Sequence, residues 1–345
     1  MLDLTNHLHI FIIVFTCFLF CFLITFYIKK VAKLIGAMDI PNARKVHTTP
    51  MPRLGGLGIF LTFLFGYMLF GIQSIQMNAI LIGAFIIVIV GVIDDISPIG
   101  AKTKLIGQII AASVVLFYGG IMLDKITIGS LHLDFGYLAY PITILFIVGC
   151  INIINLIDGL DGLSTGTCSI FYLTIGIISF MKTSFGGLNV SLAFIMLGAS
   201  LGFLVHNFHP AKIFSGDSGS MFQGFMIATI SLLGFKTVTM TSFFIPILDT
   251  VFAIIRRTLK KEPIYKPDKE HLHHQLLKLG LSHRNTVLAI YAMNILFAFA
   301  SIIYAINDKT LGIIIYIVIF ILIIFIITKT SIIADKKTLT KHKIK

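Results

Sequence analysis

The feature that most constrains this 345-residue sequence is a succession of long apolar segments, each separated from the next by a short connector. A helix needs roughly 20 apolar residues to cross about 30 Å of hydrocarbon. Hydrophobic residues make up 57% of the chain and charged residues only 12%, which excludes a soluble globular domain. We expect an all-α integral membrane protein with about eleven spans, near residues 9–28, 54–72, 77–93, 104–122, 138–154, 164–181, 189–206, 217–235, 239–256, 286–306 and 309–328.

The formal net charge of +12 reflects membrane topology and not a basic face for nucleic acid, because no folded soluble domain is present to carry such a face. With the N-terminus outside, the connectors on the inner side and the C-terminal tail hold 23 of the 27 Lys and Arg residues. This asymmetry follows the positive-inside rule and predicts a C-terminus inside the cell. The first apolar segment lacks the features of a cleaved signal peptide and is expected to stay in the membrane.

Residues 1–345 are predicted to form one polytopic domain, without internal repeats. Two long connectors, 29–53 and 256–285, lie on the predicted inner side. The second contains leucines spaced for a short amphipathic helix on the membrane surface. On the outer side, residues 124–137 alternate around a Gly-Ser pair and predict a small β-hairpin. The four cysteines fall in or beside apolar segments and are expected to be reduced packing residues.

Five of the 15 acidic residues stand in predicted inner connectors at the ends of spans, where a carboxylate can reach water or a cation. Asp94 and Asp95 are adjacent, so their mutual repulsion must be relieved by solvent or by a cation. Magnesium fits, because it prefers oxygen ligands and is commonly held by one or two carboxylates together with substrate phosphates. The alternative for an isolated Asp-Asp pair is a solvated helix end.

Two glycine-rich runs follow the same pattern. Asp217 opens a span within GDSGS, where backbone amides and the helix dipole favour phosphate, although the acid could also be a plain N-cap. Asp158 and Asp161 are three residues apart in NLIDGLDGL, which directs both to one side and leaves room beside the glycines for a ligand. We expect all five acids to converge around one divalent cation near the inner leaflet.

A histidine cluster, HLHH, supplies His271, His273 and His274 in a connector rich in Lys and Arg. These groups can contact a pyrophosphate and supply a proton. Zinc is a poorer interpretation for this cluster, because no Cys or His at ligand spacing accompanies it.

Five segments in order, VHTTPMPRLGG, GVIDDISP, NLIDGLDGLSTG, HNFHPAKIFSGDSGS and HLHHQLLKLG, resemble the motifs of the polyprenyl-phosphate N-acetylhexosamine-1-phosphate transferase superfamily. The resemblance covers nearly the whole chain. The forms of the first and last motifs are more similar to the branch that uses UDP-GlcNAc, of the TagO/TarO type, than to the MraY-type branch that uses a UDP-MurNAc-peptide.

The resemblance implies a role for each matching residue. Asp217 would ligate Mg²⁺, with Mn²⁺ as an alternative, and Asp94 and Asp95 would share the metal and the lipid phosphate as candidate catalytic groups. His271, His273 and His274 would meet the pyrophosphate, and Phe214 would lie beside the uracil ring. The remaining substrate-binding candidates are Lys45, Arg53, Asn155, Asp158, Asp161 and Asn207.

The function implied is transfer of GlcNAc-1-phosphate from UDP-GlcNAc to undecaprenyl phosphate at the cytoplasmic face of a bacterial plasma membrane, releasing UMP. The product would begin a cell-envelope glycopolymer such as teichoic acid. A MraY-type transferase and a sugar-nucleotide or lipid transporter are the alternatives, and a homodimer stays open. A transporter would be expected to hold its ionisable groups near the bilayer midplane, whereas this chain holds them at span ends.

Overall fold

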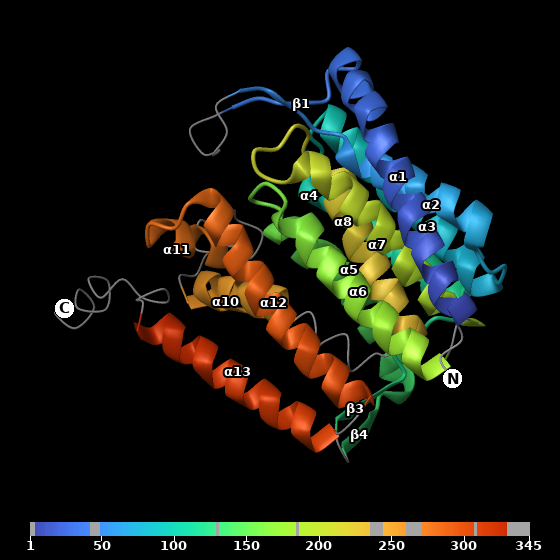
Figure 1. Ribbon diagram of the computed structural model, residues 1–345, viewed down its shortest axis with the longest axis vertical. Helices are drawn as coiled ribbons and strands as arrows, with labels where there is room; N and C mark the ends of the chain where they lie inside the picture. Colours follow the sequence, from blue (N-terminus) through green and yellow to red (C-terminus); the bar gives the residue numbers. More distant parts are fainter. Residues whose placement is uncertain are drawn as a thin grey trace.

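The computed structural model describes residues 4–41, 49–128, 131–183, 186–234, 244–259, 271–306 and 309–329. Within these ranges the molecule is a bundle of long helices (Figure 1). The helices are α1 Leu4–Leu34, α2 Gly55–Phe70, α3 Ile75–Ile96, α4 Ala101–Ser113, α5 Ala139–Ile157, α6 Leu163–Thr183, α7 Leu188–Asn207, α8 Gly216–Leu233, α10 Phe244–Leu259, α11 Leu272–Lys278, α12 His283–Ile306 and α13 Lys309–Lys329.

Each of the eleven predicted apolar segments overlaps a helix of the structure, and residues 235 and 239–243 of two of them lie outside the described ranges. Among the described residues, seven helices are long and apolar enough to cross a membrane: α1, α3, α4 with the π-helical turn Val114–Tyr118, α5 with the preceding 3₁₀ turn Gly136–Leu138, α6, α7 and α12. The shorter α2 and the described part of α13 are also apolar. The chain is therefore an all-α integral membrane protein, and the number of eleven spans and their orientation stay predictions.

The predicted hairpin is present as strands β3 Lys125–Ile128 and β4 Leu131–Asp134, which pair antiparallel with Lys125 opposite Asp134. It lies at the same end of the bundle as the start of α1 (Figure 1). This matches the prediction that the hairpin and the N-terminus share one side of the membrane. A second pair, β1 Met38–Asp39 and β2 Met51–Pro52, lies at the opposite end.

Helix α8 is the centre of the bundle, and its residues from Gly216 to Leu232 are all buried. Its polar side chains form hydrogen bonds inside the protein, as a low-dielectric interior requires, except that the Gln223 Nε2 has no partner among the described residues. The Gln223 carbonyl accepts from the Tyr172 hydroxyl at 3.1 Å, and the Gln223 side chain accepts from Ser200 at 3.1 Å. The outer helices instead expose large apolar side chains such as Phe11 and Ile321, which suits contact with lipid.

The predicted amphipathic helix is α11. Leu276 is buried, and Leu272 and Leu277 pack against a cluster that includes Val287 of α12. The apolar face of α11 is thus covered by protein, because α12 begins only a few residues later and folds back over it.

Candidate active site

Three of the predicted acids meet where the end of α3 approaches the start of α8. Asp94, Asp95 and Asp217 are all buried, and each offers a carboxylate oxygen within 4.8 Å of the others. Two basic side chains lie among them. Arg53 reaches Asp217 at 2.7 Å, Asp95 at 3.1 Å and Asp94 at 3.6 Å, and Lys104 reaches Asp217 at 2.7 Å and Asp94 at 3.1 Å.

The charges of this cluster nearly balance. Buried carboxylates are costly unless they are paired and hydrogen-bonded, and here Arg53 and Lys104 pair with three of them. One negative charge is left over. The cluster therefore keeps an attraction for a further cation while remaining stable as it stands.

Asp95 has a structural role that the sequence did not reveal. Its carboxylate accepts from the backbone N–H groups of Asp217 at 2.7 Å and Ser218 at 3.1 Å, and from the Ser218 hydroxyl at 2.6 Å. These amides belong to the first turn of α8, where the helix dipole favours a negative charge. The amides that we predicted to be free for phosphate are thus capped by Asp95, while Asp217 projects from the same turn toward the two cations.

Glycines let the backbones of α2, α3 and α8 touch at this point. A Cβ on Gly56 would lie 1.9 Å from the Gly219 nitrogen, and one on Gly91 would lie 2.3 Å from the Ser218 Cα. Gly216 has φ +72°, and a Cβ there would meet the Asp95 carboxylate at 2.4 Å. The glycines at this point give room for neighbouring chain segments, which brings Asp95 and Asp217 together.

The segment that carries Arg53 is fixed to the loop before α8 by backbone hydrogen bonds. Phe214 donates to the Pro52 carbonyl at 2.8 Å, and the Phe214 carbonyl accepts from Gly55 at 2.9 Å. Phe214 is partly buried. Lys45 lies outside the described residues.

Asp158 follows the last residue of α5, and its carboxylate accepts a hydrogen bond from Ser164. Burial raises its pKa to about 6, opposed by the Ser164 hydrogen bond and reinforced by the charge of Asp217. The carboxylate at this position is therefore protonated more readily than an ordinary aspartate.

We predict that Asp158 makes stability depend on pH. Its pKa is about 6 in the folded chain against an ordinary 3.8, so the folded state binds the proton more tightly. The resulting stabilisation is present below about pH 4 and is lost as pH rises through about 6, by at most about 3 kcal/mol. In thermal melts of purified protein, Asp158→Asn should gain Tm relative to wild type as pH rises, whereas Asp134→Asn on the exposed hairpin should not. Parallel wild-type and Asp158→Asn profiles would contradict this.

Asp161 does not join the other acids. Its carboxylate bonds to His209 Nδ1 at 2.8 Å and accepts from the Ala211 backbone N–H at 3.1 Å. The expectation that five acids converge on one cation is therefore wrong for Asp161. Its carboxylate is bound instead by His209 and Ala211 in the loop after α7. The structure joins three of the five directly, and Asp158 lies in the adjoining loop.

Two asparagines predicted to line the nucleotide pocket make internal hydrogen bonds. Asn155 donates to the Ser220 hydroxyl at 2.9 Å. Asn207 is buried, donates to the Ile213 carbonyl at 3.0 Å and accepts from the Gly162 N–H at 3.1 Å. Asn207 thus connects the loop after α5 to the loop before α8, which fixes their relative positions.

The HLHH residues begin α11. His271 is its N-cap, and its Nδ1 donates to the Asp249 carboxylate at 3.0 Å. The other Asp249 oxygen accepts from the Leu272 N–H at 2.8 Å. His273 is buried beside Gly159, where a Cβ would lie 2.6 Å from its Nε2. Burial lowers the pKa of His273 to about 3, so this ring is neutral at physiological pH. The partly buried His274 follows, its ring 4.3 Å from that of His273.

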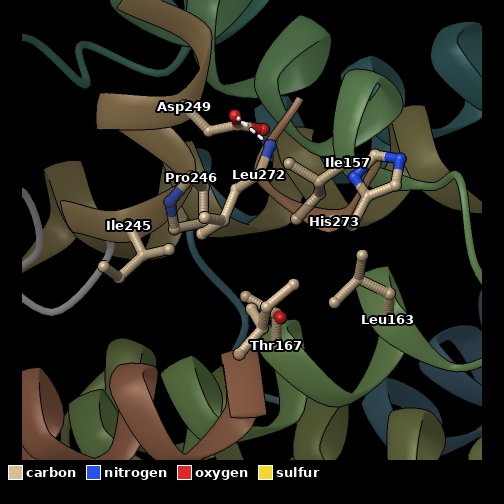
Figure 2. A pocket seen from close by; sticks show the side chains of 9 residues that line it. Ile157, Leu163, Thr167, Ile245, Pro246, Asp249, Leu272 and His273 are labelled. Carbon is tan, nitrogen blue, oxygen red and sulfur yellow. Dashed lines mark hydrogen bonds between the residues drawn. The ribbon is translucent and has the colours of Figure 1, made fainter. Parts of the chain in front are cut away.

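A small cavity of about 20 Å³ lies beneath this turn, between α5, α6, α10, α11 and α12. Figure 2 shows apolar side chains around it and His273 at its edge, with Asp249 bonded to the backbone of Leu272. The lining residues are Ile157, Leu163, Thr167, Ile245, Pro246, Asp249, Leu272, His273 and Ile290.

Sequence reasoning missed several residues of the site. Lys104 is at the start of a span, with no motif to mark it. Asp249 carried a usable signal, because a lone carboxylate within an apolar segment needs a partner. His209 lies within a recognised motif and His283 follows another by three residues, but only the fold brings them to Asp161.

The donor set of the acid cluster fits magnesium. Asp94 and Asp217, in the cluster of three carboxylates within 4.8 Å, offer the hard oxygen ligands that Mg²⁺ prefers, and the two basic side chains beside them can hold phosphate oxygens.

The chain is similar to known membrane-lipid phosphoglycosyl transferases. The model of glycosyl transferase family 4 matches residues 77–235, which include Asp94, Asp95 and Asp217. A Bacillus subtilis protein described as a probable undecaprenyl-phosphate N-acetylglucosaminyl 1-phosphate transferase is 42% identical over 94% of this chain and 90% of its own length. A Mycobacterium tuberculosis decaprenyl-phosphate N-acetylglucosaminephosphotransferase is 33% identical over 76% of this chain and 74% of its own.

An Escherichia coli K12 undecaprenyl-phosphate alpha-N-acetylglucosaminyl 1-phosphate transferase is 28% identical over 79% of this chain and 78% of its own length.

The fold and site define a multi-pass membrane enzyme of the phosphoglycosyl transferase class. The chain belongs to glycosyl transferase family 4, which confirms the resemblance drawn from its motifs.

Proposed function

We propose that this enzyme transfers GlcNAc-1-phosphate from UDP-GlcNAc to undecaprenyl phosphate, with Mg²⁺ as its metal and with its active site on the cytoplasmic face. The names of its relatives support a polyprenyl-phosphate acceptor and a GlcNAc-phosphate donor group. The excess of Lys and Arg in the connectors around the site supports the cytoplasmic side. The product would serve a cell-envelope glycopolymer, for which we favour teichoic acid.

The observation that carries this proposal is the buried cluster of Asp94, Asp95 and Asp217 bridged by Arg53 and Lys104. Such a mixture of fixed acids and bases suits phosphoryl transfer, where two anionic partners must be positioned and their charge neutralised.

In the reaction, an oxygen of the lipid phosphate forms a bond to the β-phosphorus of UDP-GlcNAc. The bond from that phosphorus to the UMP oxygen breaks, and UMP leaves with the electron pair. Bound magnesium would supply charge neutralisation between the phosphates. Arg53 and Lys104 can exchange contacts with the acids for contacts with phosphate oxygens, because both are only partly buried.

The two adjacent acids are suited to different tasks. Asp95 is fully occupied by the first turn of α8 and by Arg53, so it holds the helix in position. Asp94 accepts from the Ile99 N–H at 2.9 Å and from Lys104, and its second oxygen lies 3.6 Å from Arg53. Asp94 is therefore the better candidate to take a proton from the lipid phosphate.

The test is to incubate purified enzyme with undecaprenyl phosphate, magnesium and a mixture of UDP-GlcNAc, other UDP-sugars and UDP-MurNAc-peptide. Release of UMP with a lipid product of the GlcNAc mass is expected. A MurNAc-peptide product would favour the alternative transferase, and intact nucleotide throughout would favour a transporter.

Isotope exchange between UMP and UDP-GlcNAc without lipid tests the number of chemical steps. Exchange in the absence of lipid would contradict direct displacement, because it requires a phospho-enzyme intermediate.

We predict that Phe214→Ala weakens nucleotide binding. Stacking on a base contributes about 1 to 3 kcal/mol, so the KM for UDP-GlcNAc should rise roughly tenfold to a hundredfold while kcat changes less. Tyr137→Ala, at an exposed aromatic residue near the hairpin, is the control and should behave as wild type. An unchanged KM in Phe214→Ala would remove this residue from the uracil site.

A further inference from the structure

Among the described residues, a second group of metal-ligating side chains lies apart from the acid cluster. It contains Asp161 from the loop after α5, His209 from the loop after α7, and His283, the first residue of α12. One ligand atom from each lies within 4.8 Å of the others. Three segments distant in sequence thus contribute one carboxylate and two imidazoles to one point.

The distances in this group suit a small cation. Zinc bonds to imidazole nitrogen and carboxylate oxygen at about 2.1 Å, so tetrahedral ligand atoms lie about 3.4 Å apart. The Asp161 oxygen lies 2.8 Å from His209 Nδ1 and 3.9 Å from His283 Nε2, on either side of that value. Small side-chain movements would therefore bring all three into a first coordination sphere.

The protonation pattern also suits a metal. His283 Nε2 accepts a hydrogen bond from the Asp161 backbone N–H at 2.9 Å, so this nitrogen carries a lone pair and no proton. The His209 and His283 rings are stacked with centroids 4.2 Å apart, so the two imidazoles lie side by side. Cation binding requires His209 to move its proton from Nδ1 to Nε2, and its side chain is 38% exposed, so water can assist.

We infer that Asp161, His209 and His283 form a second cation site, selective for a borderline divalent metal such as Zn²⁺ over Mg²⁺. Two imidazoles and one carboxylate are ligands typical of zinc and other transition metals, whereas Mg²⁺ prefers oxygen alone. Three protein ligands leave one position for water. An ion bound there ties the Asp158–Asp161 loop, the loop before α8 and α12 together. This inference does not depend on the identity of the transferase substrates.

The experiment uses the full chain, purified in detergent and stripped of metal, with Zn²⁺ measured by competition with a colorimetric chelator. We expect one equivalent to bind to wild type in the presence of millimolar Mg²⁺, and a loss of at least about tenfold in affinity for His283→Ala and for His209→Ala. Co²⁺ serves as a spectroscopic probe, and its visible bands should weaken in the same two variants.

Matched controls separate this site from other histidines and from the acid cluster. His132→Ala on the hairpin, His274→Ala in HLHH and Asp217→Asn should each bind Zn²⁺ as wild type does. If His283→Ala does not fold, the test depends on His209→Ala, because the side chain of His209 is partly exposed and its removal disturbs packing less. Absence of zinc binding in wild type, unchanged binding in both site variants, or equal displacement by Mg²⁺ would overturn the inference.

Discussion

Asp217→Asn should reduce the rate of UMP release by about two to three orders of magnitude at ordinary magnesium concentrations. The substitution keeps the shape of the side chain but removes the charge that binds Lys104 and Arg53 at 2.7 Å each and that would ligate magnesium. Loss of one preorganised electrostatic contact in a buried site has an effect of this size. Initial rates should be measured over a range of magnesium concentrations, because a lost ligand raises the concentration required.

The matched control is Asp134→Asn on the exposed hairpin, which should retain wild-type rates and magnesium dependence. The Tm of both variants should be measured, so that loss of fold is distinguished from loss of chemistry. Full activity of Asp217→Asn at ordinary magnesium would show that our assignment of the metal ligand is wrong.

Gly56→Ala should abolish most activity although Gly56 touches no substrate in our mechanism. The added Cβ would lie 1.9 Å from the Gly219 nitrogen, so α2 and α8 must separate. Displacing the first turn of α8 moves Asp217 relative to Asp95, and misplacing reacting groups by about 1 Å can cost about a hundredfold in rate. Stability should also fall by about 1 to 3 kcal/mol, the usual range for overpacking.

Gly149→Ala in α5 is the control, because nothing lies within 4 Å of the position of its new Cβ and alanine favours helix. Its activity should equal that of wild type, and its Tm should be equal or slightly higher. Wild-type activity and Tm in Gly56→Ala would contradict the close packing of α2 against α8.

The sequence predicted the apolar helices, the hairpin and the motifs, since these depend on local patterns of residues. Asp94, Asp95 and Asp217 were recognisable because acids at the ends of apolar segments need a partner. Their detailed roles were not predictable. That Asp95 caps α8 depends on Gly56, Gly91 and Gly216, whose contacts with neighbouring backbone exist only in the folded bundle.

Asp161 shows, for a residue whose predicted neighbours were wrong, that side-chain contacts cannot be predicted from local sequence patterns. Its spacing from Asp158 suggested a shared task, but the turn between α5 and α6 directs its carboxylate to His209, 48 residues away in sequence. Spacing within a motif shows which residues are neighbours along the chain. It does not show which distant loop packs against them in the folded protein.

The pairing of Arg53 and Lys104 with the buried acids has a consequence for how the enzyme matures. Because these side chains act as resident counterions, the bundle can insert and fold before any divalent ion reaches it. If the enzyme uses magnesium as we propose, the ion would bind late and reversibly. Removing magnesium with a chelator should abolish the activity of such an enzyme without unfolding it. Adding the ion back should then restore the activity.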